Sequence, residues 1–260
     1  MLEFSDIEIE NLLQGIYDGS ITEYDLPENL YYAIADYLKK GLYKGFGGSL
    51  EDFAVDSVDL DLLTELRENI YMFSAAKTFQ QVSDMSEVLE ATDNFKDFKE
   101  HAGEIFGLYN DTYLKTEYDT SVASGQMGVK WNQIQAEKHI LPYVRLDVVE
   151  DDNTSDICEP LDGITVPVDD PFLDDYYPPN HWKCRTIAVQ VSEDDAEPSS
   201  KDDIEAAEDH ADEHMQDIFK MNVGKDRVVF SDEHPYFDVS KEDKGFARDN
   251  FGLPIPEDDD

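Results

Sequence analysis

Two kinds of chemistry are suggested by the segment HWKCR, which places His181 three residues before Cys184: zinc binding, or a nucleophile with its base. The only other cysteine of the chain is Cys158. Thiolate and imidazole are ligands that zinc prefers, but a structural zinc site takes four of them in a tetrahedral array. The chain offers three such side chains, and no Cys-x-x-Cys pair accompanies the His-x-x-Cys spacing. Zinc at Cys158, His181 and Cys184 therefore stays an alternative, and we assign no metal ligand and no cofactor.

Cysteine catalysis at Cys184 would need a base and a group that stabilises an oxyanion. His181 is near in sequence, and the cations Lys183 and Arg185 could lower the pKa of the thiol. However, a strand-like alternation starts immediately afterwards, and no glycine turn or orienting partner is evident. The favoured interpretation is a structural corner that closes a loop onto a sheet by packing, hydrogen bonds or a disulfide. Its residues are Cys158, His181, Trp182, Cys184 and Arg185.

A second metal-like pattern is His210, Glu213 and His214, which matches the His-x-x-Glu-His motif of inverted zinc peptidases. Histidines four residues apart share one face of a helix. The surrounding segment is rich in Asp and Glu, and this favours a solvated polar face. A metal-dependent hydrolase that uses either this group or His181 and Cys184 remains an alternative function. No phosphate-binding loop, GxGxxG or GxSxG motif is present.

The elements that must position these side chains change along the sequence. Residues 1–115 are predicted to be helical, and an apolar stripe spaced by three or four predicts one long helix. Residues 116–140 are predicted to form another helix, in which Gly125 and Gly128 would let a second backbone approach closely. The stripe consists of Val55, Val58, Leu62, Leu66, Ile70, Phe73 and Ala76.

After Pro142 the apolar period changes to two, which predicts strands at 143–149 and 186–192. A proline-rich, aromatic loop lies between them, a helix is predicted at 203–219, and RVVF at 227–230 is a candidate last strand. The predicted fold class is α+β: a helical N-terminal part followed by a small, mainly antiparallel sheet with a long irregular loop.

Charge restricts the classes of partner. The chain has 61 acidic and 20 basic residues, a formal net charge of −41. Repulsion from phosphate disfavours nucleic acids and anionic membranes. No apolar run approaches the roughly 18 residues of a membrane span, and the acidic N-terminus is not that of a signal peptide. We therefore expect a soluble, intracellular chain. An acidic protein-binding module that mimics DNA is a further alternative.

An ordered series of motifs resembles the head-morphogenesis domain of the phage Mu F-like minor head proteins. A helix runs from Thr116 through Trp131, and a strand follows it. Then come Leu161-Asp162-Gly163, an aromatic, acidic loop with Pro178-Pro179, the His-x-x-Cys-Arg element and a second strand. The resemblance covers most of residues 50–237 and is strongest at 116–192. The family commonly ends this element in His-Pro-Asn-Cys-Arg-Cys, and here Thr186 replaces the last cysteine.

The resemblance implies a non-enzymatic minor capsid protein of a tailed phage or prophage, located inside the head near the portal and in the host cytoplasm during assembly. It would act in head assembly, genome packaging or ejection. Its partners would be the portal protein, the major capsid protein or both, with no sequence-specific nucleic-acid binding and no membrane. The expected parts are a helical docking region at 1–115, a head-morphogenesis-like α+β domain at 116–192, an acidic linker at 193–203, a helix-plus-strand extension at 204–237 and an acidic tail at 238–260.

Overall fold

A computed structural model describes residues 4–252 and divides the chain into two compact units. Unit 1 takes Met1–Lys40, Glu68–Tyr118 and Asp232–Asp260, and unit 2 takes Gly41–Arg67 and Asp119–Ser231. Each unit therefore combines segments that are distant in sequence. None of the helices formed by residues 4–252 is long and apolar enough to cross a membrane.

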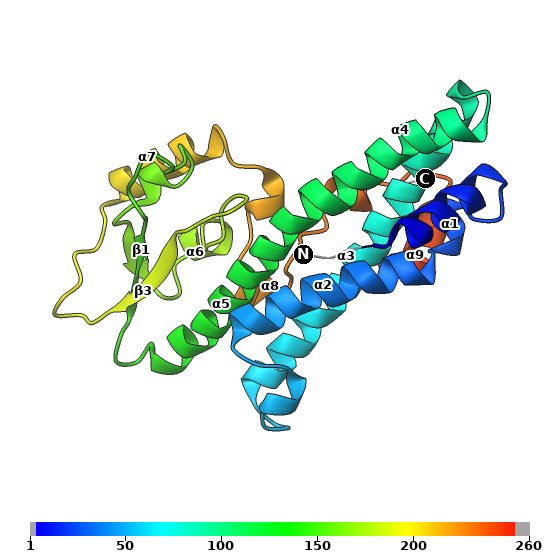
Figure 1. Cartoon of the computed structure of the whole chain (residues 1–260). Helices are drawn as coiled ribbons and strands as arrows, with labels where there is room; N and C mark the ends of the chain where they lie inside the picture. The colour runs from blue at the N-terminus through cyan, green and yellow to red at the C-terminus, as the bar shows by residue number, and fades with distance from the viewer. Residues whose placement is uncertain (1–3, 253–260) are drawn as a thin grey trace, which may run out of the picture. The chain divides into compact units, whose positions relative to one another are not determined.

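Helices dominate the first half of the chain, as the apolar periodicity predicted (Figure 1). Ser5 begins the first helix by a reciprocal capping box with Glu8, and Gly19 follows its end at a φ of 74°. A π-helical segment, Leu108–Tyr113, leads directly from the fourth helix into the fifth. The helices are α1 Asp6–Tyr17, α2 Glu28–Phe46, α3 Val58–Glu87, α4 Phe95–Gly107 and α5 Leu114–Glu137.

The apolar stripe of α3 is confirmed from Leu62 onward, where all five of its members are buried. The prediction was wrong for the first two residues of the stripe, because Val55 is 83% and Val58 is 66% exposed. The hydroxyl of Ser57 accepts a hydrogen bond from the backbone N–H of Leu60, so the helix begins only at Val58. Apolar spacing by itself therefore placed the start of the stripe too early.

Small residues let α2 and α5 approach closely within unit 2, as expected for Gly125. A Cβ atom on Gly125 would lie 2.6 Å from the carbonyl oxygen of Leu42, and one on Gly45 would lie 2.0 Å from that of Val122. Both distances are shorter than any real Cβ contact. The two backbones can therefore touch only because these positions carry no side chain.

The sheet is antiparallel in the order β2-β1-β3, with β1 at Tyr143–Asp147, β2 at Thr165–Pro167 and β3 at Ile187–Val191. This confirms the α+β class and both predicted strands. Two details differ. β2 lies inside the loop that was predicted to be irregular, because three residues are too few for a visible alternation. On β3, Ala188 is buried and Ile187 is 51% exposed, so the larger apolar side chain is not the one that faces the core.

The chain after β3 is more ordered than its acidity suggested. Ser199 donates its backbone N–H to the carbonyl of Thr165 and accepts a hydrogen bond from the N–H of Thr165 at its hydroxyl. The expected linker is thus joined to β2, and its last residues belong to α7, Lys201–Asp212, which Ser200 caps. The predicted helix at 203–219 therefore stops at Asp212, and Asp217–Phe219 forms a separate 3-10 turn.

The predicted strand at 227–230 is wrong. Arg227 has a left-handed φ of 59° at the end of the short helix α8, Val223–Asp226, and the two neighbouring residues Val229 and Phe230 are both buried. A half-buried strand would turn consecutive side chains to opposite faces. In unit 1, part of the expected tail forms α9, Lys244–Phe251, in which Phe251 is fully buried. The final Asp-rich residues lie outside the described part of the chain.

Candidate functional site

The candidate site lies in unit 2, where two loops bring Cys158 to His181 and Cys184. Cys158 follows a turn in which its backbone N–H donates to both the carbonyl and the hydroxyl of Ser155. The N–H of Cys184 donates to the carbonyl of His181, and Lys183 adopts a left-handed φ of 62° between them. These two turns fix the side chains just before β3 begins.

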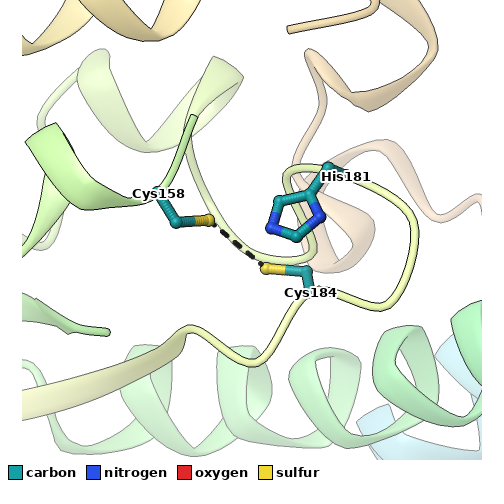
Figure 2. Close-up of side chains that lie close together, drawn as sticks. All are labelled: Cys158, His181 and Cys184. Carbon is teal, nitrogen blue, oxygen red and sulfur yellow. Dashed lines mark hydrogen bonds between the residues drawn. The ribbon is translucent and has the colours of Figure 1, made fainter. Parts of the chain in front are cut away.

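The two cysteine sulfurs lie 3.7 Å apart, and both cysteines are free. One ligand atom from each of Cys158, His181 and Cys184 can be chosen so that all three lie within 4.8 Å of one another. Figure 2 shows the sulfurs pointing toward each other, with the edge of the imidazole ring facing the space beside them. The structure therefore brings together the three residues that the sequence offered as zinc ligands.

The imidazole of His181 is oriented at both nitrogens. Nδ1 lies 2.8 Å from the carbonyl oxygen of Trp182, which can only accept a hydrogen bond, so Nδ1 carries the proton. Nε2 lies 2.9 Å from the hydroxyl of Ser155. In the neutral ring Nε2 accepts this bond and presents a lone pair, which is the state in which imidazole binds metals.

The electrostatics of the site favour one thiolate. The hydrogen bond from Cys158 lowers the pKa of Cys184 well below its usual value, and nearby His181 acts in the same direction against the effect of burial. The pKa of Cys158 is raised, first because it donates to Cys184 and second because it is buried. Burial lowers the pKa of His181, but its interaction with Cys184 outweighs this, and the net shift is upward.

The other two corner residues have partners of their own. Trp182 packs edge-on against Phe219, with 4.9 Å between the ring centroids. Arg185 donates two hydrogen bonds of 2.7 Å to the carboxylate of Asp151, and this interaction, together with the backbone N–H of Asn153, lowers the pKa of Asp151 to about 2. Arg185 therefore ties the 151–155 turn to the corner.

Thr186 was noticed in the sequence only as a replacement for cysteine. It is 5% exposed, and its hydroxyl oxygen has no hydrogen-bond partner among the described residues. Together with Cys158 and His181 it lines a small pocket. The hydroxyl lies near the thiol of Cys158 and acts to lower the pKa of that thiol, but it makes no full hydrogen bond there, and a buried hydroxyl without one costs free energy.

The second metal-like pattern is not assembled. His210 lies near the end of α7, Glu213 is the C-cap residue, and His214 lies beyond the helix; all three are exposed. The two imidazole centroids are 6.3 Å apart. Because the helix stops at Asp212, these residues do not share the continuous face on which the expectation of converging ligands depended. The group of potential metal ligands that the described residues do bring together is the cysteine–histidine one.

A buried polar cluster in unit 1 was missed by the sequence analysis. The ammonium group of Lys77 is fully buried and contacts Glu117 and the hydroxyl of Tyr236. One signal was available: Lys77 follows Phe73 by four residues, so it lies on the apolar face of α3. The sequence could not show which partners would meet it there.

Part of the chain resembles one family of known proteins. No curated protein and no solved structure matches the chain. A family model does match, and the segment it covers includes β1, β2 and all three residues of the cysteine–histidine group. Residues 76–189 match the family described as "Phage Mu protein F like protein", which confirms the resemblance seen in the motifs.

Proposed function

We propose that the protein is a minor head component of a tailed phage or prophage that binds at the portal vertex, inside the head. It acts there in head assembly, genome packaging or ejection, without catalysing a reaction. The observation that carries this proposal is the family match over residues 76–189. The partner is the portal protein, the major capsid protein or both.

The charge of the chain supports a protein partner rather than the genome. At a formal net charge of −41, contact with packaged DNA is opposed by repulsion between carboxylates and phosphates. The same charge speeds association with a cationic protein surface and makes that association sensitive to salt. We therefore expect binding to the portal to weaken as the ionic strength rises, because the Debye length falls from about 10 Å at 0.1 M to about 3 Å at 1 M.

The hydrolase alternative loses support at His210, Glu213 and His214, which are exposed and do not share one helix. At Cys184 we expect a structural role and no catalysis. Substituting Cys184→Ala should therefore reduce stability or assembly. Loss of a turnover activity in a variant that keeps its fold would contradict the non-enzymatic proposal.

The test is the location of the chain during head assembly. The full chain is produced with the portal and major capsid proteins of the same phage, and heads are separated by sedimentation at low and high salt. We expect the chain to sediment with portal-containing particles and to be lost from particles that lack a portal. A virion reconstruction should then show matching density at the portal vertex. Absence from both mature heads and assembly intermediates would reject the proposal.

A further inference from the structure

We propose that Cys158, His181 and Cys184 bind one zinc ion through two thiolates and Nε2 of the imidazole, with a solvent-derived ligand beside Thr186 in the fourth position. This inference does not rest on the proposed function, because it follows from the local geometry of unit 2. The sequence alone favoured a corner held by packing. Convergence of the three donors is what changes that interpretation.

The spacing of the sulfurs fits a shared ion. Two sulfurs, each about 2.3 Å from a tetrahedral zinc ion, lie about 3.8 Å from one another. The observed separation of Cys158 Sγ and Cys184 Sγ is 3.7 Å. A disulfide instead brings the sulfurs to about 2.05 Å. The present arrangement therefore holds the thiols at the distance of two metal ligands.

His181 has the outer hydrogen bond that a metal-binding histidine needs. Such histidines almost always donate the second ring N–H to a carboxylate, a carbonyl or water, which fixes the ring and its tautomer. Here Nδ1–H donates to the carbonyl of Trp182, and Nε2 lies on the ring edge that faces the sulfurs (Figure 2). Ser155 now bonds Nε2, and it can retain its bond from the N–H of Cys158 when a metal takes that lone pair.

Thr186 supplies the second, independent observation. Its buried hydroxyl has no partner among the described residues and lines the same small pocket as Cys158 and His181. A water bound to zinc in the fourth position would give this oxygen the hydrogen bond it lacks. Two soft thiolates and one imidazole favour zinc over magnesium or calcium, which prefer oxygen ligands.

Cobalt(II) provides a direct probe of the unmodified protein. The full chain is stripped of metal under reducing conditions and titrated with cobalt(II). Because the chain has only two cysteines, any thiolate-to-cobalt absorption reports on Cys158 and Cys184. We expect this absorption and the visible bands of tetrahedral cobalt to saturate at about one ion per chain and to disappear when zinc is added.

Two results would overturn the proposal. One is the absence of thiolate-to-cobalt absorption in folded, reduced protein. The other is a purified chain that is two hydrogens lighter, has no reactive thiol and binds no cobalt after reduction; the two cysteines would then form a disulfide pair instead.

Variants locate the ligands. Cys184→Ser and His181→Asn should each weaken zinc binding by at least about tenfold. His210→Asn is the matched control, since it removes an exposed histidine from the same unit and should leave the affinity unchanged. Thr186→Cys should tighten binding by at least about tenfold, because a third thiolate replaces the solvent ligand. Equal affinities in the wild type and Cys184→Ser, or in the wild type and Thr186→Cys, would contradict the assignment.

Discussion

The ammonium nitrogen of Lys77 lies 2.9 Å from a carboxylate oxygen of Glu117, and the two side chains are only 0% and 3% exposed. The hydroxyl of Tyr236 joins both, at 3.2 Å from Lys77 Nζ and 3.1 Å from Glu117 Oε1. Burial lowers the pKa of Lys77 and raises that of Glu117. The attraction between the two groups acts in the opposite direction and favours the charged form of each. Three residues that are far apart in sequence thus contact one another in the interior of unit 1.

Breaking this pair should destabilise the protein strongly. We expect Glu117→Gln or Lys77→Met alone to cost about 3–5 kcal/mol, because each leaves a buried charge without its counter-ion. The double variant Lys77→Met/Glu117→Gln should recover a large part of the lost free energy of unfolding, because it leaves no unpaired charge. The free energy of unfolding in urea measures the effect. Lys138→Met is the control: Lys138 pairs with Asp169 at the surface, where the side chains are 42% and 72% exposed, so its loss should cost less than about 1 kcal/mol.

The N-terminal segment 1–115 should not fold by itself. It would lack Glu117 and Tyr236, and it would expose the aromatic face of α3, where Phe79 contacts Phe251 with 5.6 Å between the ring centroids. We expect this fragment to show no cooperative thermal transition by circular dichroism, whereas the full chain shows one. A fragment with a sharp transition near that of the full chain would show that these distant contacts contribute little.

Acid should destabilise unit 1 through His234. Burial, followed by the charge of Lys77, lowers the pKa of His234 to about 3, against about 6.5 in an unfolded chain. Between these values the unfolded chain binds a proton that the folded one excludes, so this contribution to stability is complete above pH 6.5 and is lost as the pH falls toward 3.

The measurement for His234 is the difference in unfolding free energy between the wild type and His234→Asn across this pH range. The wild type should lose stability relative to the variant by up to about 1.4 kcal/mol per pH unit. Asparagine can still accept at its side chain, as Nδ1 does from the N–H of Tyr236. A pH-independent difference for His234→Asn would refute the assignment.

A methyl group at Gly45 should separate α2 from α5. Its Cβ would lie 2.0 Å from the carbonyl oxygen of Val122, so backbone must move, and we expect Gly45→Ala to cost about 1–3 kcal/mol or more. Gly103→Ala is the matched control in α4: nothing lies within 4 Å of its added Cβ, and alanine should stabilise that helix by up to about 1 kcal/mol. Thermal melts of the two variants should therefore shift in opposite directions.

Local periodicity explains which elements were predictable. The helical stripe from Leu62 to Ala76 and the alternation at Val144 and Leu146 are properties of a few consecutive residues, and the structure buries those side chains. The ordered motifs likewise sufficed to indicate the family. β2, the end of α7 and the irregular path at 227–230 depend on partners elsewhere in the chain, so no local pattern marked them.

Periodicity and motif order in the sequence indicated an α+β chain, a resemblance to the phage Mu F-like family, and the three side chains of the zinc site, Cys158, His181 and Cys184. Packing between distant segments brings Cys158 to Cys184 and His181 and buries Lys77, whereas it does not assemble His210, Glu213 and His214 into a group of metal ligands. The physical reason is the same in each case. Whether ligands converge, or a charge finds a counter-ion, depends on the distance between chain segments, and that distance is set by packing between elements rather than by spacing along one of them.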